Sequence, residues 1–135
     1  MNIVIDTNKF ISALMNDGIS RKIILETKDI LLFPEFSLLE IFNHYKEILD
    51  KSGLSEYELF LLLTQLLTKV TVVKTDQIIH YKKEADEIMR NIDIDDAIFI
   101  ATALCFDCPI WSDDNHFKKQ NRIKLITTEE MLKRT

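Results

Sequence analysis

The sequence predicts an α/β fold, a three-layer α/β/α sandwich in which helices cover both faces of a central parallel β-sheet. Short runs rich in β-branched residues alternate with longer segments whose apolar residues have helical spacing. The 135 residues are 47% hydrophobic, which is enough for one buried core. With only two Gly and two Pro, the chain contains no linker-like segment. We therefore expect a single domain over residues 1–135.

The first part of the chain reads as two strand–helix units. Residues 1–5 form a short β-branched run, and the apolar positions of Phe10–Met15 then follow helical spacing. A second helix is expected over Ser20–Thr27 and a second strand over Ile30–Phe33. Pro34 suits the first turn of a third helix, because proline there loses no helical hydrogen bond.

The middle of the chain continues the alternation. Ser55 and Glu58 form a capping-box pattern that opens a helix over Glu56–Lys69, and Val70–Val73 follows as a strand. The next helix is expected over Asp76–Arg90, with its first residue as the N-cap.

The last part of the chain contains its most apolar segment. Asp93–Phe106 is predicted to form a helix with an acidic start and an almost wholly apolar body, so it should be buried on most sides. Pro109–Ser112 and Lys124–Ile126 are the remaining strands. Thr127 and Glu130 form a second capping box, which predicts a terminal helix.

The N-terminal sequence reads as a strand and lacks the basic and apolar regions of a secretory leader. The longest apolar stretch, Leu59–Leu67, is interrupted by two polar residues and is far shorter than the ~20 residues of a membrane span. We therefore expect a soluble, cytoplasmic protein.

The two cysteines, Cys105 and Cys108, have the spacing of a redox motif but fall at the end of an expected helix. A reactive pair is instead expected at a helix N-terminus, which stabilises the thiolate. A zinc site would need two more ligands at suitable spacing, which the three histidines do not supply. Plain thiols, buried or half-buried, are the expectation.

Two acids follow expected strands. Asp6 closes the first strand, and Asp114 comes just after the strand Pro109–Ser112. Judged alone, the first fits a helix cap and the second a solvated turn. However, parallel strands place their carboxyl ends, and with them the ligand site, at one edge of the sheet. We expect both side chains at that edge.

Further acids lie on helices. Asp93, Asp95 and Asp96 open one helix, where acids suit the macrodipole, but three exceed the need of one cap. The first and third share one side, while Asp95 is turned to another face. Glu40 lies among apolar neighbours, where a lone ionised carboxylate is costly unless it is exposed on a polar stripe or paired.

Together, these positions predict a metal site. Packed carboxylates repel one another, so a site that gathers Asp6, Glu40, Asp96 and Asp114 needs compensating positive charge. Oxygen-only ligands favour Mg²⁺ or Mn²⁺. Such ions activate water and stabilise an in-line phosphoryl displacement.

The formal charge of −5 has the wrong sign for a protein that binds nucleic acid through a broad basic face. Removing the four carboxylates named above from the 22 acids leaves 18 against 17 bases. The charge therefore argues against a nucleic-acid-binding function but does not exclude it.

Four motifs, in this order along the chain, resemble those of the PIN domain, a nuclease fold. They are Val4-Ile-Asp-Thr-Asn, Ser37-Leu-Leu-Glu, Asp96-Ala-Ile-Phe-Ile-Ala-Thr-Ala and Trp111-Ser-Asp-Asp-Asn-His-Phe. The resemblance spans nearly the whole chain and implies a PIN-like sandwich. It also implies that Asp6, Glu40, Asp96 and Asp114 are the catalytic and metal-binding residues.

The resemblance also implies supporting roles and an activity. Asn8 and Ser112 would support the metal ligands through hydrogen bonds, with Asp93 beside them. His116 stands where the family often has another Asp, so it is either a surface histidine or a phosphate contact. The implied activity is a Mg²⁺- or Mn²⁺-dependent endoribonuclease, often the toxin of a toxin–antitoxin pair and commonly a homodimer.

Substrate RNA must approach a cleft whose own charge is negative. Basic groups near the motifs are candidates for phosphate contacts, or else solubilising surface charge. They are Lys9, Lys46, His116, Lys118, Lys119 and Arg122.

Two other functions fit part of the sequence pattern. A phosphoacceptor receiver domain also places carboxylates and Mg²⁺ at a parallel sheet edge, but it would have paired acids after the first strand and a late Lys-Pro step, which this chain lacks. A non-catalytic PIN-like module that binds RNA or protein is the second alternative. Four intact acids argue against it, and metal occupancy would discriminate.

Overall fold

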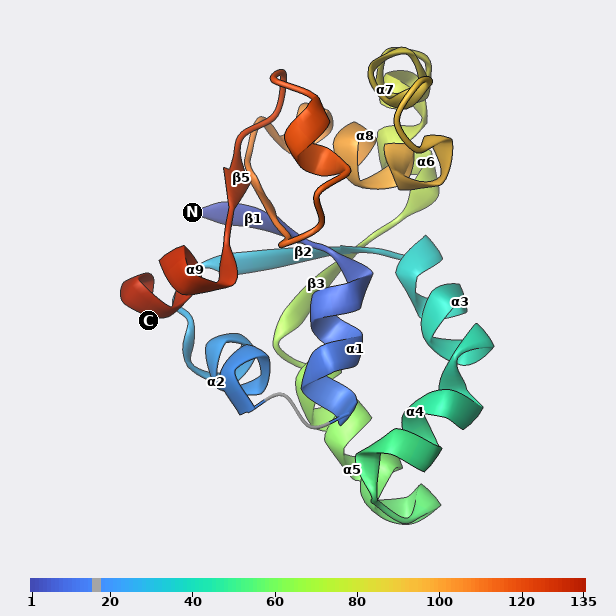
Figure 1. Cartoon of the computed structure of the whole chain (residues 1–135), viewed down its shortest axis with the longest axis vertical. Helices are drawn as coiled ribbons and strands as arrows, with labels where there is room; N and C mark the ends of the chain where they lie inside the picture. The colour runs from blue at the N-terminus through green and yellow to red at the C-terminus, as the bar shows by residue number, and fades with distance from the viewer. Residues whose placement is uncertain (16–17) are drawn as a thin grey trace.

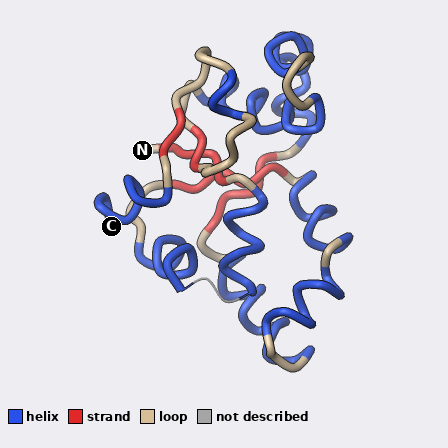
Figure 2. Tube along the Cα trace, in the orientation of Figure 1, coloured by secondary structure: helices blue, strands red, loops and turns tan. Residues whose placement is uncertain are grey.

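The computed structural model describes residues 1–15 and 18–135, and a five-stranded sheet lies at its centre (Figure 1). Every pair of neighbouring strands is parallel, in the order β3-β2-β1-β4-β5. Figure 2 shows the strands in red at the centre of the molecule, surrounded by helices. The strands are β1 Asn2–Ile5, β2 Ile30–Pro34, β3 Val70–Val73, β4 Ile110–Trp111 and β5 Leu125–Ile126.

The connections between strands are helical. Three short segments are 3₁₀ helices: η1 Ile79–Tyr81, η2 Ile94–Asp96 and η3 Phe117–Lys119. The α-helices of the described residues are α1 Thr7–Met15, α2 Gly18–Glu26, α3 Phe36–Asn43, α4 Tyr45–Ser52, α5 Glu56–Leu67, α6 Thr75–Ile78, α7 Lys82–Met89, α8 Ala97–Phe106 and α9 Thr128–Arg134.

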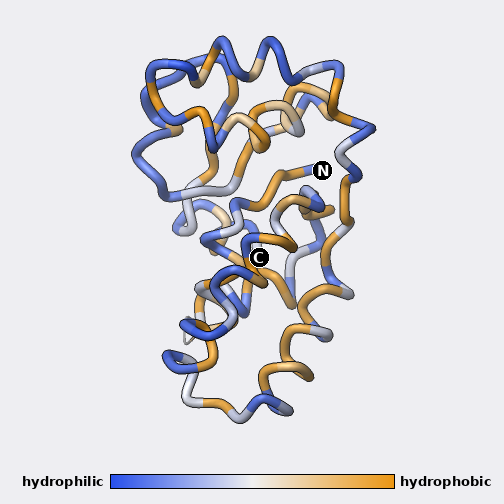
Figure 3. The backbone as a smooth tube through the Cα atoms, turned by 90° about the vertical axis from the view of Figure 1, so that its right-hand side faces the viewer, coloured by the Kyte–Doolittle hydropathy of each residue, from blue (hydrophilic) through white to orange (hydrophobic). Residues whose placement is uncertain are grey.

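The sheet separates two hydrophobic cores, because successive side chains of a strand point to opposite faces. Ile3 and Ile5 of β1 join a core formed with α1, α2, α5 and α9. Val4, between them, joins the other core, formed with α6, α7 and α8. Strand β1 appears orange in Figure 3, as expected for a strand buried on both faces. The predicted three-layer α/β/α sandwich is confirmed.

Two residues predicted to open helices do not do so. Pro34 ends β2, where the next amide, of Glu35, donates to the Val73 carbonyl at 2.9 Å and keeps the strand pairing. Asp76 was expected as an N-cap but lies inside the first turn of α6. The side chain of Gln77 closes this helix start by accepting from the Lys74 amide at 3.0 Å.

Two expected helices are also divided. The segment predicted as Asp76–Arg90 consists of α6, η1 and α7. The segment predicted as Asp93–Phe106 starts with the 3₁₀ turn η2 before α8 begins at Ala97. Asp93 caps this turn by accepting from the Asp95 amide at 3.0 Å.

Both predicted capping boxes are present. Ser55 accepts from the Glu58 amide at 3.1 Å, and Thr127 accepts from the Glu130 amide at 3.2 Å. Cys105 and Cys108 are free, and burial raises the pKa of the Cys108 thiol to about 11, as expected of a plain thiol. Over the described residues, no helix has the length and apolar character needed to cross a membrane.

An aromatic contact fixes the segment that follows β4. Phe117, which is fully buried, meets Phe99 of α8 edge-on, with 6.1 Å between ring centroids. Such pairs contribute beyond the area they bury. The contact ties the β4–β5 connection to the helix that carries Asp96 at its start.

Phe117→Ala should lower the free energy of unfolding by about 3–5 kcal/mol, because it leaves a cavity against Phe99. Phe60→Ala is the matched control: that side chain, on α5, is 59% exposed, so the change should stay within about 0.5 kcal/mol. Urea unfolding followed by circular dichroism measures both. Equal effects of the two substitutions would contradict this account of the packing.

Candidate metal centre

The carboxyl ends of β1 and β4 bring Asp6 and Asp114 together. Asp6 directly follows β1, and its amide donates to the Trp111 carbonyl of β4 at 3.1 Å. Ser112 then links the two acids: its hydroxyl donates to Asp6 Oδ2 at 2.7 Å and accepts from the Asp114 amide at 3.0 Å. These two hydrogen bonds are the kind of contact that the predicted supporting role of Ser112 requires.

Glu40 reaches the same edge from α3. The Thr7 hydroxyl lies 2.8 Å from Glu40 Oε1 and 2.6 Å from the Ser37 hydroxyl. An ionised carboxylate can only accept and a hydroxyl has one proton, so Thr7 donates to Glu40 and accepts from Ser37. These two hydroxyl groups orient the carboxylate of Glu40. Glu40 thus lies beside Thr7 in space, although the two residues are 33 positions apart in the sequence.

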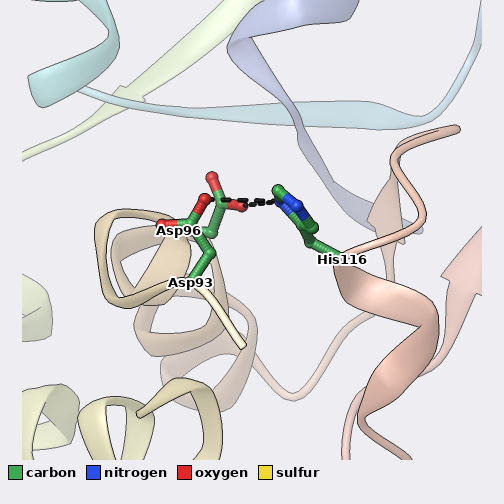
Figure 4. Close-up of side chains that lie close together, drawn as sticks. All are labelled: Asp93, Asp96 and His116. Atoms are coloured by element: carbon green, nitrogen blue, oxygen red, sulfur yellow. Dashed lines mark ion pairs between the residues drawn. The ribbon is translucent and has the colours of Figure 1, made fainter. Parts of the chain in front are cut away.

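Asp96 enters from the start of α8, with Asp93 one turn earlier. Figure 4 shows both side chains pointing toward His116, which comes from the segment after β4. His116 Nδ1 lies 3.3 Å from Asp93 Oδ2 and 3.5 Å from both Asp96 Oδ2 and Asp114 Oδ1. Sequence analysis expected a surface histidine or a phosphate contact here, but Nδ1 is buried against three carboxylates.

We call Asp6, Glu40, Asp96 and Asp114 the acidic cluster. Their electrostatic coupling is direct: Asp6 is influenced by Asp114, Glu40 by Asp6, and Asp96 by both Asp6 and Asp114. The structure thus brings all four predicted acids to the carboxyl edge of the sheet.

Burial and like charge raise the pKa of three carboxyl groups, those of Asp6, Glu40 and Asp96. Burial raises the pKa of Asp6, which is 3% exposed, and the charge of Asp114 adds to the rise. Burial likewise raises the pKa of Glu40, against the hydrogen bond from Thr7. Burial, followed by the charge of Asp93, raises the pKa of Asp96 to about 6. The protein alone therefore disfavours a fully ionised cluster.

A family comparison identifies the fold. The family model of the PIN domain matches residues 4–134, nearly the whole chain. The chain belongs to the PIN domain family. A search of curated proteins found no match. PIN domains are generally metal-dependent nucleases that use divalent ions, so the fit of this site to a metal is the next question.

Two observations fit a divalent cation in this PIN domain. Among the described residues, no Lys or Arg forms an ion pair with a member of the acidic cluster. Asp96 Oδ2 and His116 Nδ1 are buried, yet neither has a hydrogen-bond partner. Buried polar atoms are normally satisfied, and these two belong to a group, Asp93, Asp96 and His116, spaced to hold one ion.

The predicted substrate-binding residues of this PIN domain lie in different surroundings. Lys9 is held by Asp113, with 2.7 Å between Nζ and Oδ2, and Arg122 pairs with Glu84 at 3.2 Å. Exposed side chains belong to Lys46, Lys118 and Lys119. Asn8 supports Asp6 through its backbone amide, which donates to Asp6 Oδ1 at 3.2 Å.

Three neighbours of the site were not predicted from the sequence. Thr7 and Ser37 orient Glu40, and the only signal was their position inside the first and second motifs. Asp113, next to Asp114, has a structural role: it accepts from the Thr128 amide at 3.0 Å at the start of α9 and also contacts the Thr128 hydroxyl. The neighbouring residues Asp113 and Asp114 therefore have different roles.

The raised pKa of Asp96 predicts how pH changes the stability of the metal-free protein. Its folded-state pKa of about 6 exceeds the ordinary value of 3.8, so the folded chain binds more protons between these values. Ionised Asp96 therefore destabilises the fold at higher pH. Asp96→Asn should be more stable than the wild type above pH 6, by on the order of 2 kcal/mol, and the difference should shrink toward pH 4.

Urea unfolding in EDTA across this pH range measures the difference. Asp113→Asn is the control of opposite sign: although burial opposes it, hydrogen bonds from Lys9 and Thr128 hold the pKa of Asp113 below its usual range. Asp113 therefore stabilises the fold at neutral pH, and this contribution is lost as pH falls below about 4. A pH-independent difference between Asp96→Asn and the wild type would refute the assignment.

Proposed function

We propose that this PIN domain is a Mg²⁺- or Mn²⁺-dependent endoribonuclease that hydrolyses RNA phosphodiester bonds. The observation that carries the proposal is the acidic cluster at the carboxyl edge of the sheet, with a buried Asp96 oxygen that has no hydrogen-bond partner among the described residues. A metal ion would satisfy both the unpaired oxygen and the unbalanced charge.

In this proposal, Asp6, Glu40, Asp96 and Asp114 hold the metal. When bound, a divalent ion lowers the pKa of water and stabilises the charge of the phosphoryl group during in-line displacement. The chain's own contribution is to fix the carboxylates. Ser112 holds Asp6, and Thr7 holds Glu40, so these two groups need little reorganisation when the ion binds.

Substrate approach depends on positive charge beyond the cluster. Lys118 and Lys119 lie on η3, two and three residues after His116, and are exposed, so they are the best placed of the predicted phosphate contacts. Lys9 and Arg122 are engaged with Asp113 and Glu84 and would have to exchange these partners for phosphate. Lys46 and His116 complete the predicted set.

A homodimer, an antitoxin partner and a toxin role are predictions from the family resemblance, and a cytoplasmic location is a prediction from the sequence itself. Apolar side chains exposed on α3 support a protein partner, since Leu39 and Phe42 are 59% and 70% exposed. A homodimer is the simplest partner, because closed twofold assembly is the commonest form of oligomer.

A non-catalytic binding module is the second candidate function. An apolar groove of about 330 Å³ supports it, lined by Phe36 of α3, Ile79 of η1 and Ile94 of η2, among others. Asp95, on its rim, lies near enough to Glu40 to raise the pKa of that group. Metal binding without RNA cleavage by the wild-type protein would favour this module over the nuclease.

Asp6→Asn should abolish Mg²⁺- or Mn²⁺-dependent RNA cleavage while the protein still folds. The substitution keeps the shape of the side chain and removes one repelling charge, so stability of the apoprotein should hold or rise. Cleavage of a mixed RNA pool is measured together with thermal melting, with and without Mn²⁺. Asp50→Asn, an exposed acid of α4, is the matched control and should behave as wild type. Cleavage and metal-induced stabilisation that both persist in Asp6→Asn would rule out this role.

Charge reversal at Lys118 and Lys119 should weaken RNA binding and reduce its salt dependence, because each lost phosphate contact lowers the number of released counterions. Binding of a fluorescent RNA by a cleavage-deficient Asp6→Asn background, measured at several salt concentrations, gives both quantities. The control reverses Lys22 and Lys28, exposed groups on α2 and just before the amino end of β2. If both double variants lose RNA affinity equally, the loss is due to the change in net charge and not to contacts at Lys118 and Lys119.

A further inference from the structure

His116 gives the candidate metal centre a nitrogen donor. Its Nδ1 atom faces Asp93 Oδ2 at 3.3 Å and Asp96 Oδ2 and Asp114 Oδ1 at 3.5 Å (Figure 4). None of these contacts is a hydrogen bond, since Nδ1 is buried without a hydrogen-bond partner among the described residues. An imidazolium serving as a simple ion-pair partner would direct its N–H at one carboxylate oxygen.

The spacing of these atoms fits ligands of one ion. Neighbouring ligands of an octahedral ion with bonds near 2.1 Å lie about 3.0 Å apart. The separations of 3.3–3.5 Å are slightly wider, as expected of a site whose ligands repel one another before a cation draws them in. Ligand atoms of Asp93, Asp96 and His116 all lie within 4.8 Å of one another.

The fold holds the imidazole in this place. The His116 amide donates to Asp114 Oδ1 at 2.9 Å, which shapes the turn after β4. The next residue, Phe117, is buried against Phe99 of α8, the helix that Asp96 precedes. The backbone of His116 is therefore held on one side by the turn after β4 and on the other by the contact of Phe117 with α8. Its position is set by packing and is not that of a free surface histidine.

We propose that His116 Nδ1 is a metal ligand, and that this nitrogen makes the centre select Mn²⁺ over Mg²⁺. The inference rests on the proposed metal-dependent function and refines the metal it uses. Carboxylate oxygens accept both ions, whereas imidazole is a poor ligand for Mg²⁺ and a good one for transition metals. A donor set of several carboxylates with one imidazole retains enough hard oxygen character for Mn²⁺.

The test measures metal binding without RNA. Calorimetric titration of the whole chain with Mn²⁺ alone and with Mg²⁺ alone gives the ratio of the two dissociation constants. His116→Asp replaces the nitrogen by an oxygen donor and should reduce the preference for Mn²⁺ at least about tenfold. His80→Asp makes the same change at an exposed residue of η1, away from the acidic cluster, and should leave the ratio unchanged.

Pulsed electron paramagnetic resonance of the Mn²⁺-loaded chain reports the ligand directly. Protein labelled with ¹⁵N-histidine should show nitrogen coupling to Mn²⁺ that is lost in His116→Asp and retained in His80→Asp. His116→Gln serves if the Asp variant does not fold, and it should also lose the coupling. A wild-type chain that binds Mn²⁺ with no histidine coupling and an unchanged ratio in His116→Asp overturns this inference while leaving the metal-dependent function intact. A wild-type chain that binds neither ion overturns both.

Discussion

Repulsion among the carboxylates of the acidic cluster is the constraint on which the rest of this structure depends. Parallel strands β1 and β4 end side by side, so acids placed after them meet, and α3 and α8 add Glu40 and Asp96. Burial and mutual charge raise the pKa of Asp6, Glu40 and Asp96, which shows that ionisation is unfavourable in the chain alone. Such an arrangement persists only because the two hydrophobic cores and the hydroxyl groups of Thr7, Ser37 and Ser112 hold it in place.

The two cores act on different members of the cluster. The core of α1, α2, α5 and α9 contains the buried Ile41, next to Glu40, and Trp111 just before Ser112. The opposite core contains Ala97, which follows Asp96, and Phe117, which follows His116. Glu40, Asp96 and His116 are thus each adjacent in sequence to a buried residue of one of the two cores. Hydrophobic packing on both faces of the sheet therefore fixes the positions of the polar groups at its edge.

The sequence was sufficient to predict the alternation of strands and helices, the parallel sheet and both capping boxes, because period-2 and helical patterns and local hydrogen bonds are encoded within a few residues. Pro34 and Asp76 were misplaced because strand pairing with β3 and the Gln77 side chain determine where those elements end and begin. The links from Thr7 to Glu40 and from His116 to Asp93 could not be predicted by spacing. They join residues 33 and 23 positions apart, whose approach only the tertiary fold determines.

The different roles of Asp113 and Asp114 explain why the cluster lacks a cation of its own. Asp113 forms an ion pair with Lys9 and accepts a hydrogen bond at the start of α9. Lys9 is the lysine nearest to Asp6 in the sequence, and its ammonium group is therefore engaged in a structural contact. Asp114 is turned the other way, toward His116. Within the described part of the chain, the acidic cluster consequently has no Lys or Arg partner, although 17 such residues exist in the sequence. The Lys and Arg residues of the described part thus leave the charge of the cluster uncompensated, which fits a divalent ion bound through these carboxylate oxygens.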